Sequence, residues 1–214
     1  MTFSLLGRCV ETGQFGAVVT TSSPCVGARV PFLSAKVGGI LTQHRTDPRL
    51  GPRGLALMSS GCTAEETLAA LVASTTDHQW RQLAAIDATG ATAFFNGAVN
   101  KPLVGQAQGQ DCVAIGNILA SSEVPQAMVD AFVAASGSSL AERLLLAVEA
   151  GEAAGGEGRP VRSACLKVVD SEIFPLMDLR IDASDTTIPA LRALWLEYSP
   201  RCQDYVEWAL RPHI

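Results

Sequence analysis

The sequence predicts an α+β fold in which antiparallel sheets carry helices. Short apolar runs separated by turn residues occur near the N-terminus, around residue 85 and after residue 160, a pattern typical of β-hairpins. Longer segments with helical periodicity lie between and after them. No repeat of fixed period and no linker divides the 214 residues. We therefore expect one domain, residues 1–214, with an aromatic-rich helical tail at about 187–214.

The N-terminal half begins with the clearest hairpin signal. An apolar run opens at Thr2, Thr12-Gly13 forms a tight turn, and residues 15–21 form the antiparallel partner. A loop is expected at residues 21–27, where serine, proline and glycine gather. The further elements expected here are a buried strand at 37–43, a short helix at 51–60 and a helix at 63–73 behind the capping box Thr63-Ala64-Glu65-Glu66.

The C-terminal half starts with a second hairpin, which turns at Ala88-Thr89-Gly90. Its expected strands are 81–87 and 91–95, followed by weaker candidates at 103–106 and 112–115. Helices are expected at 123–135 and 139–150, and the second of these segments is capped and amphipathic. A glycine-rich loop at 153–160 then leads to strands at 163–169 and 176–181, a helix at 188–197 and a helical segment after Pro200.

The aromatic tail has two open interpretations. Both tyrosines and two of the three tryptophans lie after residue 190. Such a cluster is typical either of core packing or of a subunit contact, and the sequence favours neither. We expect a homodimer or a higher homo-oligomer.

Composition excludes several functional classes. Hydrophobic residues make up 48% of the chain, enough for a thick core, and 21 acidic against 16 basic residues give a net charge of −5. No stripe of Lys or Arg favours nucleic acid as a partner. No membrane span or signal peptide is predicted, so we expect a cytoplasmic protein. The six cysteines form no C-x-x-C pair and the three histidines are scattered, so we expect structural thiols, no metal and no cofactor.

Thr2 is the first candidate for chemistry. It follows Met1 directly and opens the first strand. If Met1 is removed, Thr2 presents a free α-amine and a hydroxyl on adjacent atoms, so one residue supplies both base and nucleophile. A small residue at position two also occurs in many proteins without catalysis, so this pattern needs its structural context.

Several stretches taken together resemble the family of domain of unknown function 1028 (DUF1028), which is grouped with the N-terminal-nucleophile (Ntn) hydrolases. The resemblance runs from Thr2 to about residue 200, and the set is specific through its order and spacing. The stretches are Thr2-Phe3-Ser4, Glu11-Thr12-Gly13, Val26-Gly27, Gly38 through Gln43, Gly51-Pro52-Arg53-Gly54-Leu55, Arg81-Gln82-Leu83, Gly116-Asn117-Ile118-Leu119-Ala120, Ala153-Ala154-Gly155-Gly156 and Asp178-Leu179-Arg180-Ile181-Asp182.

The resemblance implies a four-layer αββα sandwich of two antiparallel sheets, with the nucleophile at the start of the first strand. It also implies amide hydrolysis through an acyl-enzyme on Thr2, whose α-amine has an unperturbed pKa of about 7.7–8. Such a mechanism requires an oxyanion hole. Asn117 and Gln43 are the candidate polar donors. Ser4 would support Thr2 if it faces the site, and plain packing is the equal alternative.

The same resemblance points to residues around the substrate. Arginines suit a substrate carboxylate because the guanidinium fork binds it in a bidentate manner, but each is also a candidate for a structural ion pair. The cations available are Arg81, Arg159, Arg162 and Arg180, and the motif around the glycine loop adds Glu157 and Ser163.

The chain departs from the family pattern at four places, one of which is Val161-Arg162 in place of Arg-Gln ahead of Ser163. Glu157 stands where the family usually has aspartate, and Pro160 replaces a glycine, which removes a backbone donor and stiffens the loop. Lys36 stands where the family usually has a small residue. A lysine near this distance lowers the pKa of the nucleophile's amine in proteasome-type members, and the resemblance leaves open whether Lys36 has this role.

Two functions remain in competition at this level. The first is an Ntn amidohydrolase that cleaves a small amide, an acyl-amino acid or a short peptide. The second is a non-catalytic protein of the same fold that binds a small metabolite. A purely structural oligomeric role rests on the aromatic tail alone.

Overall fold

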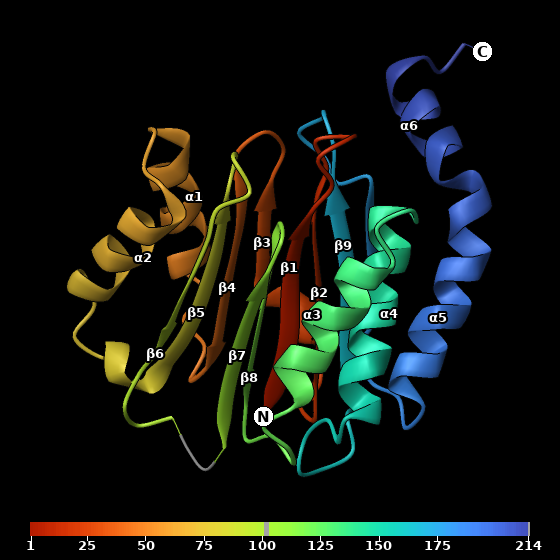
Figure 1. Ribbon diagram of the computed structural model, residues 1–214. Coiled ribbons are helices and arrows are strands. Elements are labelled where there is room, and N and C mark those ends of the chain that lie inside the picture. The colour runs from red at the N-terminus through yellow and green to blue at the C-terminus, as the bar shows by residue number, and fades with distance from the viewer. Residues whose placement is uncertain (101–102, 214) are drawn as a thin grey trace.

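Two antiparallel sheets form the centre of the protein (Figure 1). The structure is a computed structural model that describes residues 1–100 and 103–213. Six of the described strands form one sheet in the order β10-β9-β2-β1-β8-β7, and four form the other in the order β3-β4-β5-β6. The strands are β1 (Thr2–Arg8), β2 (Phe15–Thr21), β3 (Pro31–Ser34), β4 (Gly38–His44), β5 (Arg81–Asp87), β6 (Thr92–Asn96), β7 (Val104–Gly109), β8 (Cys112–Asn117), β9 (Ser163–Val169) and β10 (Met177–Ile181).

Helices cover the outer face of each sheet. Helices α1 (Leu50–Ser59) and α2 (Ala64–Ala73) pack on the four-stranded sheet. Helices α3 (Val124–Ala134), α4 (Leu140–Ala153) and α5 (Thr187–Tyr198) pack on the six-stranded sheet. Helix α6 (Cys202–Leu210) follows α5 and has no buried residue. Three short 3-10 helices complete the described elements: η1 (Val26–Ala28), η2 (His78–Trp80) and η3 (Ser199–Arg201).

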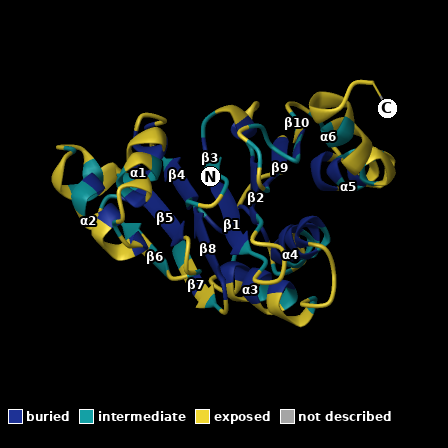
Figure 2. Ribbon diagram, turned by 90° about the horizontal axis from the view of Figure 1, so that it is seen from above, coloured by how far each residue is buried: buried dark blue, intermediate teal, exposed yellow. Residues whose placement is uncertain are grey.

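The period-two pattern of β1 shows how the sheets and helices are stacked. Phe3 and Leu5 belong to an apolar cluster shared with α3 and α4, whereas Leu6 belongs to a cluster shared with Leu41 and Ile86 of the four-stranded sheet. Successive residues of a strand point to opposite faces. The two sheets therefore face each other across one core, and each sheet packs against helices on its other side. The central strands β1, β5 and β8 are therefore covered on both faces, and Figure 2 shows them as buried.

The sequence-based expectations agree with most of these elements. The predicted strands 15–21, 81–87 and 163–169 have the observed bounds, and Thr63 and Glu66 form both bonds of the predicted capping box. Strand β3 was not predicted, because it is a four-residue edge strand that begins with proline. Strands β7 and β8 run to Gly109 and Asn117, beyond their predicted ends, since pairing with β1 extends β8 to the site described below.

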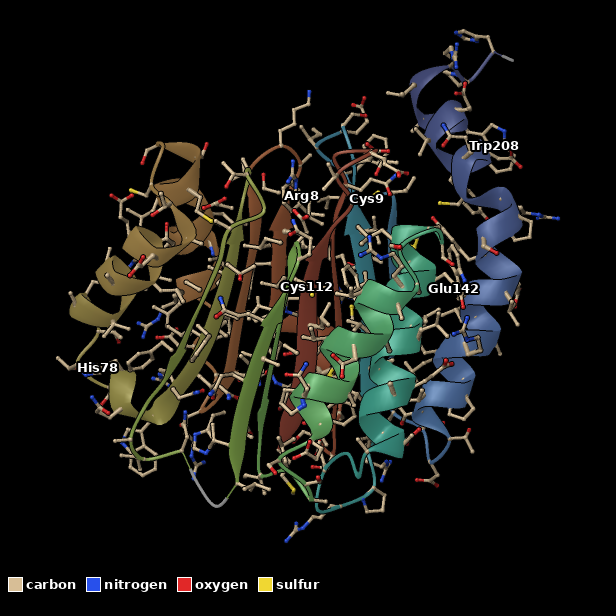
Figure 3. The ribbon with its side chains drawn as sticks, viewed as in Figure 1. Arg8, Cys9, His78, Cys112, Glu142 and Trp208 are labelled. Atoms are coloured by element: carbon tan, nitrogen blue, oxygen red, sulfur yellow. The ribbon has the colours of Figure 1, made fainter. Side chains whose placement is uncertain are left out.

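The aromatic tail divides between core and surface. Trp195 of α5 is only 9% exposed, and its indole N–H donates to Glu142 of α4 at 2.9 Å. Figure 3 shows Glu142 on the side of α4 that faces α5, and Trp208 on α6 at the far end of the molecule. Trp208 is 54% exposed. Leu196, Tyr205 and Leu210 of α5 and α6 are exposed as well, and the Tyr205 and Trp208 rings are in contact. We call these four exposed residues of the two helices the tail patch.

Candidate active site at the shared edge of the two sheets

Four neighbouring strands of the six-stranded sheet end in a row of polar side chains. In the register of the sheet Thr2 of β1 lies opposite Asn117 of β8, and Thr21 of β2 lies opposite Ser163 of β9. Thr2 and Thr21 are themselves neighbours, because Phe3 pairs with Thr20. Residues that face each other across an antiparallel pair share a side of the sheet. All four side chains therefore face the opposite sheet. They lie at the strand ends where the N-terminus is found (Figure 1), and we call this end of the two sheets their shared edge.

Thr2 is buried, at 6% exposure, and its hydroxyl is already oriented. The Thr2 hydroxyl donates to the carbonyl oxygen of Met1 and lies 3.3 Å from Oγ1 of Thr21. The Thr21 hydroxyl also donates to the Met1 carbonyl. Two hydroxyls thus converge on one carbonyl oxygen at the start of β1.

A buried network of amides joins the two sheets beside Thr2. Ser4 donates to Oε1 of Gln43 at 2.8 Å, and Gln43 Nε2 donates to Oε1 of Gln82 at 2.7 Å. Gln82 Oε1 also accepts from Asn117 Nδ2 at 3.0 Å, while Gln82 Nε2 donates to Asn96 Oδ1 and to the Gly116 carbonyl, each at 2.8 Å. Hydrogen bonds between buried amides restrict the side chains that they join. The bond to Gln82 therefore orients the side chain of Asn117, which lies opposite Thr2.

The Asn117 side chain keeps hydrogen-bonding capacity that the described residues do not use. Its Oδ1 is buried and has no partner among them. Its amide nitrogen carries two hydrogens and is within bonding distance of one acceptor, Gln82 Oε1. An unpaired buried polar atom is costly, and in native structures it is often found where a functional group or ligand binds.

A polar cavity of about 480 Å³ opens beside Thr2. Its volume suits a small molecule. The lining includes three arginines from three separate segments, Arg29, Arg45 and Arg81, together with His44 and the two threonines of the row. No Asp or Glu is among the described residues that line it.

Glu157 is a buried acid close to the N-terminus. It is 7% exposed, its Oε2 accepts from the backbone N–H of Ser22 at 3.1 Å, and its Oε1 has no partner among the described residues. Burial raises the pKa of this carboxyl to about 7, although the charge of the Met1 amine opposes the shift. Burial also lowers the pKa of the Met1 amine; Glu157 opposes this shift, while Arg159 and Arg45 add to it. The net effect on the Met1 amine is a pKa below its ordinary value.

Unusual backbone conformations gather around the same edge. Cys25, His44 and Ile118 have φ values of 57°, 71° and 54°, in the left-handed region that residues with a Cβ rarely adopt. Ile118 is β-branched and directly follows Asn117, and His44 lines the cavity. Strain of this kind persists where the surroundings impose it, and it is frequent at functional sites.

The comparisons with known proteins agree on one family. The model of a family of unknown function, DUF1028, matches residues 2–191. A crystal structure of protein SPO2555 from Silicibacter pomeroyi, described as a DUF1028 family model, is 32% identical with a TM-score of 0.86; the match covers 92% of this chain and 86% of that one. The chain belongs to the DUF1028 family. No curated protein matches it.

The structure of the present chain brings together most of the residues singled out from the sequence. Thr2, Asn117 and Arg81 lie at the cavity or in the row beside it. Gln43 lies next to them, but its amide nitrogen already donates to Gln82 and to the Ile115 carbonyl. Gln43 therefore supports the site by holding Gln82. Ser163 is the last residue of the row. Its hydroxyl donates to the Ser23 carbonyl and accepts from the Val26 N–H.

Other predicted residues lie apart from the cavity. Glu157 and the exposed Arg159 line a separate cavity of about 330 Å³ formed with the glycine loop. Arg180 is bound at 2.7 and 2.8 Å to Asp178, and Arg162 is paired with Asp185. These last two arginines are structural partners in the described part of the chain, and neither lines the cavity.

The suggested role of Lys36 is wrong for a geometric reason. Lys36 is exposed in the turn between β3 and β4. Strand β4 then runs the seven residues from Gly38 to His44 before it reaches the cavity. At about 3.3 Å per residue this separates Lys36 from the site by roughly 20 Å, too far to lower the pKa of the Thr2 amine.

Four residues of the DUF1028 site were missed from the sequence: Arg29, Arg45, Thr21 and Gln82. Thr21 and Gln82 lie within predicted strands, but only the pairing of those strands puts them beside Thr2 and Asn117. Arg29 and Arg45 occupy loops that the sequence gave no reason to join. A test for polar residues at strand ends would have found Thr21 alone.

Further features of the described residues carry no comparable chemistry. A cavity of about 180 Å³ lies at the opposite end of β1, where Figure 3 shows Arg8 and Cys9, and Arg8 is paired there with Asp111 at 3.0 Å. The six cysteines are free thiols, and burial raises the pKa of Cys112 to about 11. Among residues 1–100 and 103–213 there is no cluster of metal-binding side chains, and none of the helices is long and apolar enough to span a membrane.

Proposed function

We propose that this chain, once Met1 is removed, is an Ntn amidohydrolase that cleaves a small amide, an acyl-amino acid or a short peptide. The observation that carries the proposal is the position of Thr2. It is the first residue of a central strand, its hydroxyl faces the opposite sheet, and it borders a polar cavity. A nucleophile there combines a rigid scaffold with access to a small molecule.

The stacking of the elements supports the assignment to the Ntn superfamily. Helices, sheet, sheet and helices follow one another, and β1 begins at the candidate nucleophile. This order of layers agrees with the αββα layout that the resemblance implies, in which the nucleophile lies at the start of the first strand. In the proposal, methionine aminopeptidase removes Met1 in the cytosol, which the small side chain of Thr2 permits.

The proposed reaction has two steps. The neutral α-amine of Thr2 accepts the proton of the Thr2 hydroxyl while Oγ1 bonds to the carbonyl carbon of the amide. The proton then passes to the leaving nitrogen as the C–N bond breaks, which leaves an ester on Oγ1. Water, deprotonated by the same amine, attacks the ester and releases the acid, and Oγ1 regains its proton. A lowered amine pKa, as burial produces for the amine at Met1, favours the first step.

In this proposal Asn117 is the oxyanion donor. It lies opposite Thr2, and one of its two amide hydrogens has no acceptor assigned among the described residues. Asn117 is fully buried in the presence of Met1, so the proposal requires that loss of Met1 opens a path to it. Removal of one such donor typically lowers the rate by about 10²–10³-fold. Gln82 and Gln43 would hold Asn117 in place.

The test compares one protein before and after removal of Met1. Protein that retains Met1 is treated with an aminopeptidase, the loss of one methionine is followed by intact mass, and hydrolysis is measured on a panel of amides and acyl-amino acids. We expect activity to appear only after trimming. Thr2→Ser should keep part of the activity, whereas Thr2→Ala should lower it by about 10³-fold or more with an unchanged melting temperature.

Full activity of the Thr2→Ala protein would overturn the mechanism. If the trimmed protein hydrolyses none of these compounds and Thr2→Ala still binds them unchanged, the alternative function is favoured, a non-catalytic protein that binds a small metabolite. The cavity supports that alternative as well, because its arginines do not depend on the chemistry of Thr2.

A further inference from the structure

We propose that Arg29, Arg45 and Arg81 form a carboxylate-binding subsite beside Thr2, so that the compound bound there is an acidic amide. That the ligand is an amide rests on the proposed function, whereas that it is acidic rests on the cavity alone. We call the three residues the arginine subsite.

The arginine subsite is assembled from three segments that are distant in sequence. Arg29 follows η1, Arg45 directly follows β4, and Arg81 opens β5. Strands β4 and β5 are paired, with His44 opposite Arg81, which brings the last two arginines together. All three line the cavity that also contains Thr2. A ligand held by these arginines is therefore within the same cavity as the Thr2 hydroxyl.

No described carboxylate forms an ion pair with the arginine subsite, although the charge of Arg81 contributes to lowering the pKa of nearby Asp47. Among the described residues no carboxylate lies within 4.0 Å of Arg29, Arg45 or Arg81. The same holds for Arg53, Arg143, Arg159 and Arg201, whereas six arginines are paired: Arg8, Arg49, Arg162, Arg180, Arg192 and Arg211. Asp47, the nearby acid, is engaged by Arg49 at 2.9 and 2.8 Å. Three unpaired cations in one acid-free cavity of a chain with net charge −5 concentrate a local positive potential.

The guanidinium groups also keep donors for a ligand. Nε of Arg81 is buried without a partner, while Nη1 of Arg81 donates to the Arg45 carbonyl. Nη1 of Arg29 donates to the carbonyls of Pro24 and Cys25, both at 2.8 Å, which holds the side chain and leaves its other N–H groups. A guanidinium carries five N–H donors, so each group retains several. Arg29 and Arg81 are thus oriented before any ligand arrives, whereas the guanidinium of Arg45 lies over the Trp80 ring, 6.0 Å from its centroid.

A carboxylate matches these donors best. Its two oxygens lie in one plane and accept the parallel N–H pair of a guanidinium fork. The cavity of about 480 Å³ has room for a small amide with its carboxylate at the arginines and its carbonyl near Thr2. An inorganic phosphate presents similar oxygens, and the experiment below separates the two anions.

Binding is measured on Thr2→Ala protein that lacks Met1, so that turnover does not interfere. Isothermal titration calorimetry compares three probes: succinate, its neutral diamide succinamide, and inorganic phosphate. We expect succinate to bind at least tenfold more tightly than succinamide and more tightly than phosphate. Its affinity should fall as the salt concentration rises, because ion pairs at an open cavity are screened.

Substitutions then assign the binding to the subsite. Arg45→Gln and Arg81→Gln should each weaken succinate binding about tenfold to a hundredfold, the range expected for a hydrogen-bonded charge. Arg53→Gln is the matched control, because Arg53 bonds Ser74 on the far side of the four-stranded sheet and does not line the cavity. Arg45 is exposed, so its substitution keeps the test valid if Arg81→Gln fails to fold.

Three outcomes overturn the inference: equal binding of succinate and succinamide, tighter binding of phosphate than of succinate, or unchanged affinity in both arginine variants. Kinetics with wild-type protein lacking Met1 separates this inference from the proposed function. Hydrolysis of neutral amides as fast as acidic ones would remove the subsite and leave the hydrolase. Subsite-dependent succinate binding without hydrolysis of any acidic amide would remove the hydrolase and leave the subsite.

Discussion

Replacement of Glu157 by glutamine should remove a large pH dependence of stability. The Glu157 carboxyl is 7% exposed, and burial raises its pKa from 4.5 to about 7. A carboxyl whose pKa is raised in the folded state stabilises that state only while it is protonated. Its favourable contribution is complete below pH 4.5 and is lost as the pH rises to about 7.

The size of the effect follows from these two pKa values. Relative to a carboxyl with a pKa of 4.5 in both the folded and the unfolded state, the raised pKa of Glu157 lowers the free energy of unfolding by about 0.8 kcal/mol at pH 5 and about 3.3 kcal/mol at pH 8. The difference attributable to this group is about 2.5 kcal/mol between the two pH values. Glutamine is uncharged at both, and its carbonyl oxygen can still accept from the N–H of Ser22.

The assay is urea denaturation of wild type and Glu157→Gln at pH 5 and pH 8. We expect the free energy of unfolding to fall between these pH values by about 2.5 kcal/mol more in the wild type than in the variant. Glu65→Gln removes the same charge from an exposed position on α2 and should behave as the wild type does. An equal pH dependence in wild type and Glu157→Gln would refute the reasoning, because the carboxyl would then be hydrated in the folded protein.

Three further predictions concern the scaffold. Gly38→Ala should destabilise the protein by about 2 kcal/mol or more in urea denaturation, because its φ is 136° and a Cβ would lie 2.1 Å from a carbonyl oxygen; Gly137→Ala meets no atom within 4 Å and should change little. Gln82→Ala should cost about 2–4 kcal/mol and lower any hydrolase activity, since it leaves several buried amides unpaired; unchanged stability would contradict the network. Trp208→Glu in the tail patch should convert the homo-oligomer expected from the sequence to a monomer, as measured by light scattering. Val10→Glu, which changes another exposed apolar residue, should leave the oligomer intact. A wild-type protein that is already monomeric would disprove the oligomer.

The fold was predictable to the extent that it depends on local signals. Alternation of apolar residues and turn residues located β1, β2, β5 and β9, and the box formed by Thr63 and Glu66 marked the start of α2. These signals act over a few residues, so they can be recognised in one sequence. Strand order does not have this property, because it depends on which apolar faces bury each other.

The candidate site also has one part that the sequence predicted and another that only the tertiary structure revealed. The sequence by itself pointed to Thr2, because a threonine directly after Met1 at the start of an apolar strand is a local feature. Only the tertiary structure decided its neighbours: the register puts Asn117 opposite Thr2, and the pairing of β4 with β5 brings Arg45 to Arg81. The physical reason is that a cavity and its charge arise from side chains of separate segments, which meet only when the two sheets pack face to face.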